Sequence, residues 1–310
     1  MVKVAVVGTG LVGRAWSIVF ARAGFDVAMW DAYAPAVGAA RDFIGRRLPE
    51  LGEAGLLKGQ LPEQVMARLA TAPSLAAALA SAEFAQESGP ERVADKLALF
   101  TEMDRLAPPE TIFASSTSTI RASVFSEAVP GRARCLVAHP VNPPYLIPLV
   151  ELSPAPWTDA AVVDRTCALM QNAGMVTAVV KREVDGFILN RLQAALLSEA
   201  MSLIEAGTAD AEDIDATVKH GLGLRWSFMG PFETIDLNAP GGLTDYCGRY
   251  GPSFVEMMTQ SKPSSWSRET IEALDRVQRA RTPAGEHTAR QEWRDRRLMA
   301  LLAHKATQPG

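Results

Sequence analysis

Residues 2–13 read VKVAVVGTGLVG, and this stretch decides the fold. The first six residues are rich in valine and run directly into three glycines with the spacing G-x-G-x-x-G. The amphipathic stretch 14–23 follows, and a second apolar run at 26–30 comes after Gly24. This order predicts a buried strand, a tight turn, a helix and a second strand, which together start a βαβ unit.

Each glycine of the motif has its own task in a dinucleotide-binding turn. Gly8 permits the tight turn out of the strand, Gly10 lets the backbone approach a pyrophosphate, and Gly13 lets the helix pack against the strand. The free N–H groups at the start of the helix, at Leu11 and Val12, favour phosphate binding. We expect these five residues to bind a dinucleotide, although a glycine-rich turn in another α/β protein would share the short pattern.

The second apolar run ends in an acid, Asp31, which lies 18 positions after the last glycine of the motif. A carboxylate at about this distance accepts hydrogen bonds from the adenosine ribose hydroxyls and repels a 2′-phosphate. Neither Ala32 nor Tyr33 supplies an arginine that could hold such a phosphate. The sequence therefore predicts NAD as the cofactor rather than NADP.

Short apolar runs recur along the first half of the chain. Residues 34–70 are helical in pattern, with breaks expected at Pro49 and Pro62, and strand-like runs follow at 83–87, 111–114 and 134–138. This alternation predicts an α/β fold with a Rossmann-type, doubly wound parallel sheet. Because ligands lie beyond the carboxyl ends of such strands, we expect the polar residues that end them to share one crevice, namely Glu87, Ser115–Ser118 and His139.

The alternation stops after Arg182. Residues 185–206 form a long apolar helical run with Asp185 as the expected N-cap, and further helical runs continue to about residue 304. We therefore expect a Rossmann domain over 1–183, followed by an all-helical C-terminal domain over 184–310.

Composition limits the function. The 310 residues carry 31 basic and 35 acidic side chains and are 48% apolar, which argues for a fully folded protein and against a nucleic-acid partner. The three cysteines have no short spacing and are expected to be thiols, and we expect no metal site. No run is long enough to span a membrane and no signal peptide precedes the first strand, so we expect a cytoplasmic protein.

One histidine has the setting of a general base. His139 ends a predicted strand before a proline-fixed turn, whereas His220, His287 and His304 are expected to be structural. Glu151 follows in the run LVEL, and a buried glutamate next to an imidazole would fix its tautomer and stabilise the imidazolium. The alternative for Glu151, taken alone, is a surface acid at a strand end.

Four further segments accompany the glycine motif: Ser116–Ile120 (STSTI), His139–Pro143 (HPVNP), Leu149–Glu151 (LVE) and Asp185–Arg191 (DGFILNR). With these motifs, residues 1 to about 250 resemble the 3-hydroxyacyl-CoA dehydrogenase superfamily. Four segments, Ala138–Tyr145, Ile147–Leu152, Gly221–Trp226 and Gly230–Glu233, are similar to its branch of L-gulonate 3-dehydrogenase and λ-crystallin.

The resemblance implies roles for single residues. His139 would take the proton of the substrate hydroxyl, with Glu151 as its carboxylate partner. Ser118 would hydrogen-bond the reacting oxygen, and Asn190 would help to hold substrate and histidine. For Ser118, an N-cap of the next helix is the alternative.

Further residues and the assembly follow from the same resemblance. Glu87 and Lys96 would lie near the nicotinamide side of NAD, and Asn142 would lie near the substrate. The helical domain would form a homodimer. Ser116 departs from the family, which usually has asparagine there, and this leaves the local turn geometry open.

The substrate stays open among several acids. Arg225 would suit a bidentate clamp on a substrate carboxylate, and a surface position or an ion pair with Glu233 is the alternative. The first expectation is a small free hydroxy acid, with L-gulonate as the first candidate. A 3-hydroxyacyl-CoA held by Arg46, Arg47 and Lys58 is a rival, as are carnitine and a pyridine carboxylate. A crystallin-like structural protein without activity is the alternative outside enzymes.

Overall fold

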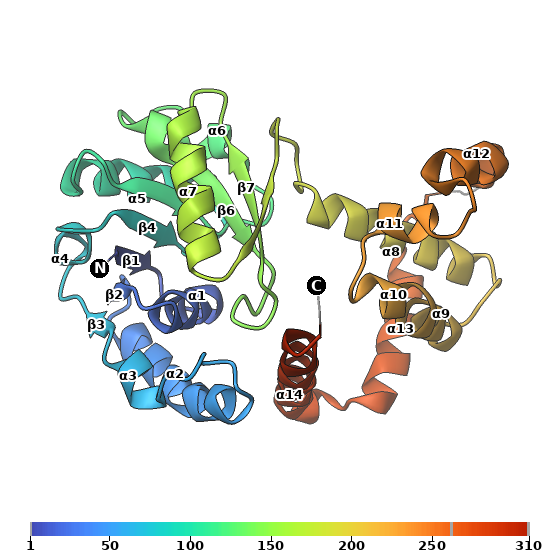
Figure 1. Cartoon of the computed structure of the whole chain (residues 1–310), viewed down its shortest axis with the longest axis horizontal. Helices are drawn as coiled ribbons and strands as arrows, with labels where there is room; N and C mark the ends of the chain where they lie inside the picture. The colour runs from blue at the N-terminus through green and yellow to red at the C-terminus, as the bar shows by residue number, and fades with distance from the viewer. Residues whose placement is uncertain (1, 261–262, 309–310) are drawn as a thin grey trace. The chain divides into compact units, whose positions relative to one another are not determined.

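Eight strands form one sheet in the order β3-β2-β1-β4-β5-β6-β7-β8 in the computed structural model, which describes residues 2–260 and 263–308 (Figure 1). The strands are β1 (Lys3–Val7), β2 (Asp26–Trp30), β3 (Leu69–Thr71), β4 (Phe84–Glu87), β5 (Ile112–Ser115), β6 (Cys135–Pro140), β7 (Leu149–Pro154) and β8 (Val176–Val179). The strand order reverses between β1 and β4, which is the topological switch point of a doubly wound sheet. The predicted Rossmann-type fold is confirmed.

One strand pair departs from the expected parallel sheet. β6 and β7 are antiparallel, and the register sets His139 opposite Glu151. The connection between them, residues 141–148, is far shorter than the dozen or more residues of a parallel crossover, so the chain has to turn back on itself. β3 and β8 are short strands at the two edges of the sheet, and the sequence pattern did not predict them.

Helices cover both faces of the sheet. They are α1 (Leu11–Arg22), α2 (Pro35–Glu53), α3 (Pro62–Met66), α4 (Leu75–Leu79), α5 (Val93–Leu106), α6 (Ala122–Ser126), α7 (Ala160–Asn172) and a 3-10 turn at Arg132–Arg134. Strand β1 alternates between two cores: Val4 and Val6 face a cluster with α1, α2, α3 and α7, whereas Ala5 and Val7 face one with α4, α5 and α6. Burial of both faces explains why β1 is apolar at nearly every position.

The second half of the chain is helical, as predicted. It contains α8 (Leu189–Glu205), α9 (Ala211–Thr217), a π-helical segment at Val218–Leu222, α10 (Gly223–Trp226), α11 (Pro231–Asp236), α12 (Gly242–Gln260), α13 (Arg268–Arg281), a 3-10 turn at Ala284–Glu286 and α14 (His287–Ala306). Among the described residues, no helix is long and apolar enough to cross a membrane.

Two helix expectations are wrong in detail. Helix α2 continues through Pro49, whose ring is exposed near the C-terminal end of the helix. Helix α8 begins at Leu189 rather than at Asp185, because Gly186 and Phe187 have φ angles of 77° and 51° and interrupt a right-handed helix. Asp185 does not cap a helix and pairs with Arg121 at 3.0 Å.

The chain forms two compact units. The first contains residues 1–190 and 291–310, and the second contains residues 191–290. Residues 291–310 therefore belong to the first unit, whereas the sequence led us to expect all of 184–310 in one helical domain. The physical reason is packing, because Met299 of α14 is buried in the core of the first unit together with residues of α1 and α2.

Candidate active site

The glycine-rich turn after β1 leaves no room for side chains at two positions. Gly8 has a φ of 90°, and a Cβ there would lie 2.8 Å from the carbonyl carbon of Ser88. A Cβ on Gly13 would lie 1.8 Å from the carbonyl oxygen of Gly8, so only glycine lets α1 approach the turn this closely. A Cβ on Gly10 would meet nothing within 4 Å, which leaves an open cradle in front of Leu11 at the start of α1.

Asp31 directly follows β2 and is held by the same turn. Oδ2 of Asp31 accepts hydrogen bonds from the backbone N–H of Thr9 at 2.6 Å and from the hydroxyl of Thr9 at 3.2 Å. Oδ1 of Asp31 accepts from the N–H of Tyr33 at 2.9 Å. The carboxylate is therefore fixed beside the glycine turn.

Glu87 lies beneath the loops rather than in an open crevice. Its side chain is completely buried, and Lys96 Nζ contacts both carboxylate oxygens at 3.1 and 3.0 Å. Ser115 Oγ donates to Oε2 at 2.5 Å, and the N–H of Gly89 donates to Oε1 at 2.6 Å. The buried ion pair thus joins the ends of β4 and β5 to α5.

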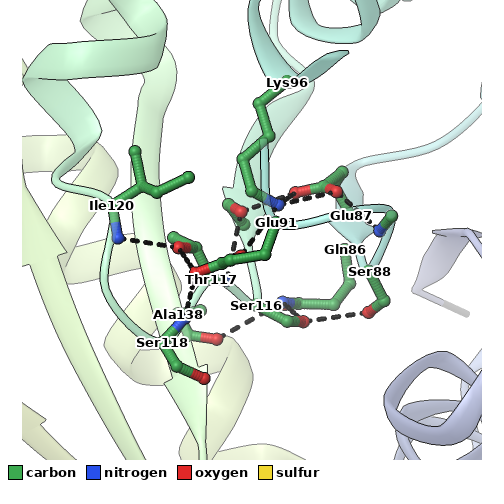
Figure 2. Close-up of polar contacts among 12 residues, drawn as sticks. Gln86, Glu87, Ser88, Glu91, Lys96, Ser116, Thr117, Ser118, Ile120 and Ala138 are labelled. Atoms are coloured by element: carbon green, nitrogen blue, oxygen red, sulfur yellow. Dashed lines mark hydrogen bonds and ion pairs between the residues drawn. The ribbon is translucent and has the colours of Figure 1, made fainter. Parts of the chain in front are cut away.

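Glu91 binds the backbone and side chains of the loop after β5, a role that the sequence did not predict. Its Oε1 accepts hydrogen bonds from the hydroxyl of Thr117 at 2.5 Å and from the N–H groups of Ser118 and Thr119 at 3.0 and 3.2 Å (Figure 2). Burial raises the pKa of Glu91, but these hydrogen bonds and Lys96 outweigh it and hold the pKa below its ordinary value. The available signal was an acid in the loop that follows a strand.

Serine fits at position 116, where the family usually has asparagine. Its hydroxyl accepts from Trp16 Nε1 at 3.1 Å. It also accepts from Gln86 Nε2 at 2.7 Å and lies 2.9 Å from Ser88 Oγ (Figure 2). One hydroxyl can accept two hydrogen bonds and donate one, so these contacts use it completely. The turn after β5 is therefore well formed with serine.

His139 and Glu151 form a buried pair across β6 and β7. The Nδ1 of His139 lies 2.8 Å from Oε2 of Glu151, and the two residues are 4% and 1% exposed. The ring of Phe187 packs on the imidazole with a centroid distance of 5.4 Å. Because the carboxylate occupies Nδ1, Nε2 is the nitrogen that can accept a proton from a ligand.

The second oxygen of Glu151 is satisfied by the backbone. The N–H groups of Ile188 and Leu189 each donate to Oε1 at 2.8 Å, directly after the left-handed turn at Gly186 and Phe187. Burial raises the pKa of Glu151, but hydrogen bonds from His139 and from the two amides outweigh it and keep the pKa below its ordinary value. Glu151 is therefore ionised next to the imidazole at neutral pH.

The other expected site residues are more open. Asn190 Nδ2 donates to the carbonyl of Ser118 at 2.8 Å, which brings these two residues together, and both Ser118 and Asn142 are exposed. Arg225 lies in α10 of the second unit and is half-buried. Within the described part of the chain, Arg225 forms no ion pair with Glu233, whose Oε2 accepts the N–H of Gly230 at 2.7 Å.

Comparison with known families places this geometry in context. Residues 3–184 match the model of the 3-hydroxyacyl-CoA dehydrogenase NAD-binding domain, and residues 186–282 match that of the C-terminal domain. The chain belongs to the 3-hydroxyacyl-CoA dehydrogenase family. As a member of this family it is an NAD-dependent dehydrogenase acting on a CH–OH group, and the resemblance seen in the sequence is confirmed.

Individual relatives cover most of the chain. It is 41% identical to the lambda-crystallin homolog of Bos taurus over 99% of its length and 96% of that protein. It is 38% identical to an L-carnitine dehydrogenase of Streptomyces griseus over 89% of its length and 79% of that protein. A 5-formyl-3-hydroxy-2-methylpyridine 4-carboxylic acid 5-dehydrogenase has the same fold, with a TM-score of 0.85 over the whole of both chains and 24% identity.

The residues present fit the cofactor of this family. The open cradle at Gly10 and the free N–H groups at the start of α1 suit a pyrophosphate, and the fixed carboxylate of Asp31 suits the ribose hydroxyls of NAD. When bound, NAD supplies the acceptor for a hydride.

Replacing Asp31 with asparagine is expected to weaken NADH binding about tenfold, because a hydrogen bond to a charged group is worth roughly 1.5–3 kcal/mol. Without the charge, NADPH is no longer repelled, so the preference for NADH over NADPH narrows. Fluorescence titration with both dinucleotides measures this. Asp26→Asn, at the other end of β2, is the matched control, and an unchanged preference in Asp31→Asn would contradict the assignment.

Proposed function

We propose that this protein oxidises the 3-hydroxyl of a small free hydroxy acid, with His139 and Glu151 as the general base pair. The observation that carries the proposal is the buried contact of 2.8 Å between Nδ1 of His139 and Oε2 of Glu151. An imidazole titrates near neutral pH, which suits proton removal from an alcohol as the hydride leaves.

The proposed reaction separates one hydrogen of the alcohol as a proton and one as a hydride. Nε2 of His139 takes the hydroxyl proton while the C–H electron pair leaves as hydride, so the alcohol carbon becomes a carbonyl. The ionised Glu151 stabilises the imidazolium that forms. Ser118 and Asn190, which contact one another, hold the reacting oxygen.

The ion pairs of Arg47 favour a free acid over a CoA thioester as the substrate. Of the three basic residues considered for CoA phosphates, Arg47 is 8% exposed and pairs with Glu50 and Asp295. Its charge is therefore already used inside the protein. The likeness to an L-carnitine dehydrogenase over 89% of the chain supports the same choice, because the substrate in that name is a small free hydroxy acid. L-gulonate is the first candidate, and Arg225 is the proposed carboxylate clamp.

The substrate proposal is tested by NADH formation with purified protein and three alcohols: L-gulonate, L-carnitine and L-3-hydroxybutyryl-CoA. We expect turnover of L-gulonate and at least about a hundredfold lower kcat/KM with the thioester. A thioester has no free carboxylate, so a site built for one would leave its charged group unpaired, which costs roughly this much discrimination. Arg225→Lys should raise the KM for L-gulonate because a bidentate contact is lost. Preference for the thioester would contradict the proposal, and preference for carnitine would move it to another acid.

The base pair is tested by Glu151→Gln, which keeps the shape and one acceptor oxygen. The carboxylate stabilises the imidazolium that forms, so its loss is expected to lower kcat/KM about a hundredfold, within the range of general-base contributions. Glu110→Gln, an exposed acid, is the control. An unchanged kcat/KM in Glu151→Gln would contradict the pairing.

We also propose that the second unit forms a homodimer and that the protein is cytoplasmic. Helices α8 and α12 contain no buried residue. In α12, apolar side chains recur at spacings of seven, four and three and are 41–50% exposed, namely Leu243, Tyr250, Phe254 and Met257. A stripe of this kind is typical of an interface. The free thiols Cys135, Cys167 and Cys247 support a reducing compartment.

Phe254→Glu is expected to convert the dimer to a monomer, because it places a charge within the apolar stripe. Multi-angle light scattering during size-exclusion chromatography measures the mass directly. Ser253→Glu introduces the same charge at the neighbouring position and should leave the dimer intact. A wild-type mass of about 33 kDa at all concentrations would overturn the proposed dimer.

A further inference from the structure

Helix α14 lies outside the part of the chain that the family models match. The C-terminal family model ends at residue 282, whereas α14 spans His287–Ala306. The alignment with the lambda-crystallin homolog covers 99% of the chain and therefore extends over this segment. From residue 291 onward the helix belongs to the first unit, where Met299 is 4% exposed in the core. This segment beyond the family models is thus well packed.

The helix brings one buried carboxylate to the first unit. Asp295 is 6% exposed, and its Oδ2 lies 3.3 Å from the hydroxyl of Tyr145 and 3.7 Å from Nη2 of Arg47. Its Oδ1 lies 2.7 Å from Nη2 of Arg294. Burial raises the pKa of Tyr145 above its ordinary value and the carboxylate adds to this, so the hydroxyl stays protonated and donates to Asp295.

Tyr145 anchors the loop that follows the candidate base. The loop of residues 141–148 joins β6 to β7, begins two residues after His139 and carries Asn142. The ring of Tyr145 is 2% exposed, and its carbonyl accepts a hydrogen bond from Nη1 of Arg22 at 2.8 Å. The N–H groups of Leu146 and Ile147 donate to the carbonyl of Pro143 at 2.9 Å. The loop is therefore compact, and its side-chain tether is Asp295.

We infer that Asp295 is a positioning residue, which acts through Tyr145 to fix the loop of residues 141–148 beside His139. A buried carboxylate is weak evidence for stability alone, because its desolvation offsets most of the attraction to its partners. Its directional contact with Tyr145 instead selects one arrangement of the loop. The inference rests on the proposed role of His139, so its test includes a measurement that needs no turnover.

The test uses Asp295→Asn, Tyr145→Phe and the double variant. Each single variant is expected to lower kcat/KM about tenfold, mainly through KM, since small misplacements of positioning groups reduce rates strongly. The kcat/KM of the double variant should be no lower than that of the less active single variant, because both substitutions remove the same contact. The Kd for NADH should stay unchanged. Hydrogen–deuterium exchange of peptides covering residues 141–148 should become faster.

Two controls separate positioning from stability. Glu292→Gln neutralises an exposed acid one turn earlier on α14 and should change nothing. Asp104→Asn breaks another largely buried ion pair in the same unit, with Arg134 at 2.6 Å, and should lower the Tm without changing KM or loop exchange. If Asp295→Asn and Tyr145→Phe behave like Asp104→Asn, the inference is overturned. If loop exchange rises but no hydroxy acid is turned over, the proposed function fails instead.

Discussion

A carboxylate that is almost completely buried needs a partner for each oxygen, and the arrangement around Glu151 follows from this requirement. Its Oε2 contacts His139 because β7 runs antiparallel to β6 and sets the two residues opposite one another. Its Oε1 accepts hydrogen bonds from the backbone N–H groups of Ile188 and Leu189, which lie at the start of α8 directly after the left-handed turn. The reversal of one strand and the interruption of one helix thus serve the same charged group.

The turn before α8 has a conformational cost that its own side chain offsets. A residue other than glycine with a φ of 51°, as at Phe187, costs about 1–3 kcal/mol. Burying its ring completely contributes about 1.5–3 kcal/mol, so the two terms are similar in size. The same ring lies against the imidazole of His139 and restricts its movement. Phe187 therefore has a strained backbone, fills part of the core and orients the imidazole of His139.

The sequence predicts what depends on local pattern and misses what depends on distant partners. The glycine turn, Asp31 and the alternation of strands and helices are read from neighbouring residues. Glu87 ends β4 and Glu91 lies in the loop after it, and sequence alone does not tell which is buried beneath the loop and which accepts from Thr117. Asp295 lies 150 residues from Tyr145, in a helix whose pattern is that of a solvated face. Such pairings become visible only after folding.

The loops at the carboxyl edge of the sheet are fixed by acceptors placed behind them. Glu87 and Glu91 hold the loops after β4 and β5 through hydroxyls and backbone amides, and the loop after β6 is compact around the buried Tyr145. A site on short loops gains precision only when a second layer of contacts locks them. The carboxylates of Glu87 and Glu91 accept hydrogen bonds from N–H and O–H groups of these loops, so their acceptor sites are used within the protein. The exposed side chains of Ser118 and Asn142 thereby stand on a backbone that has little freedom to move.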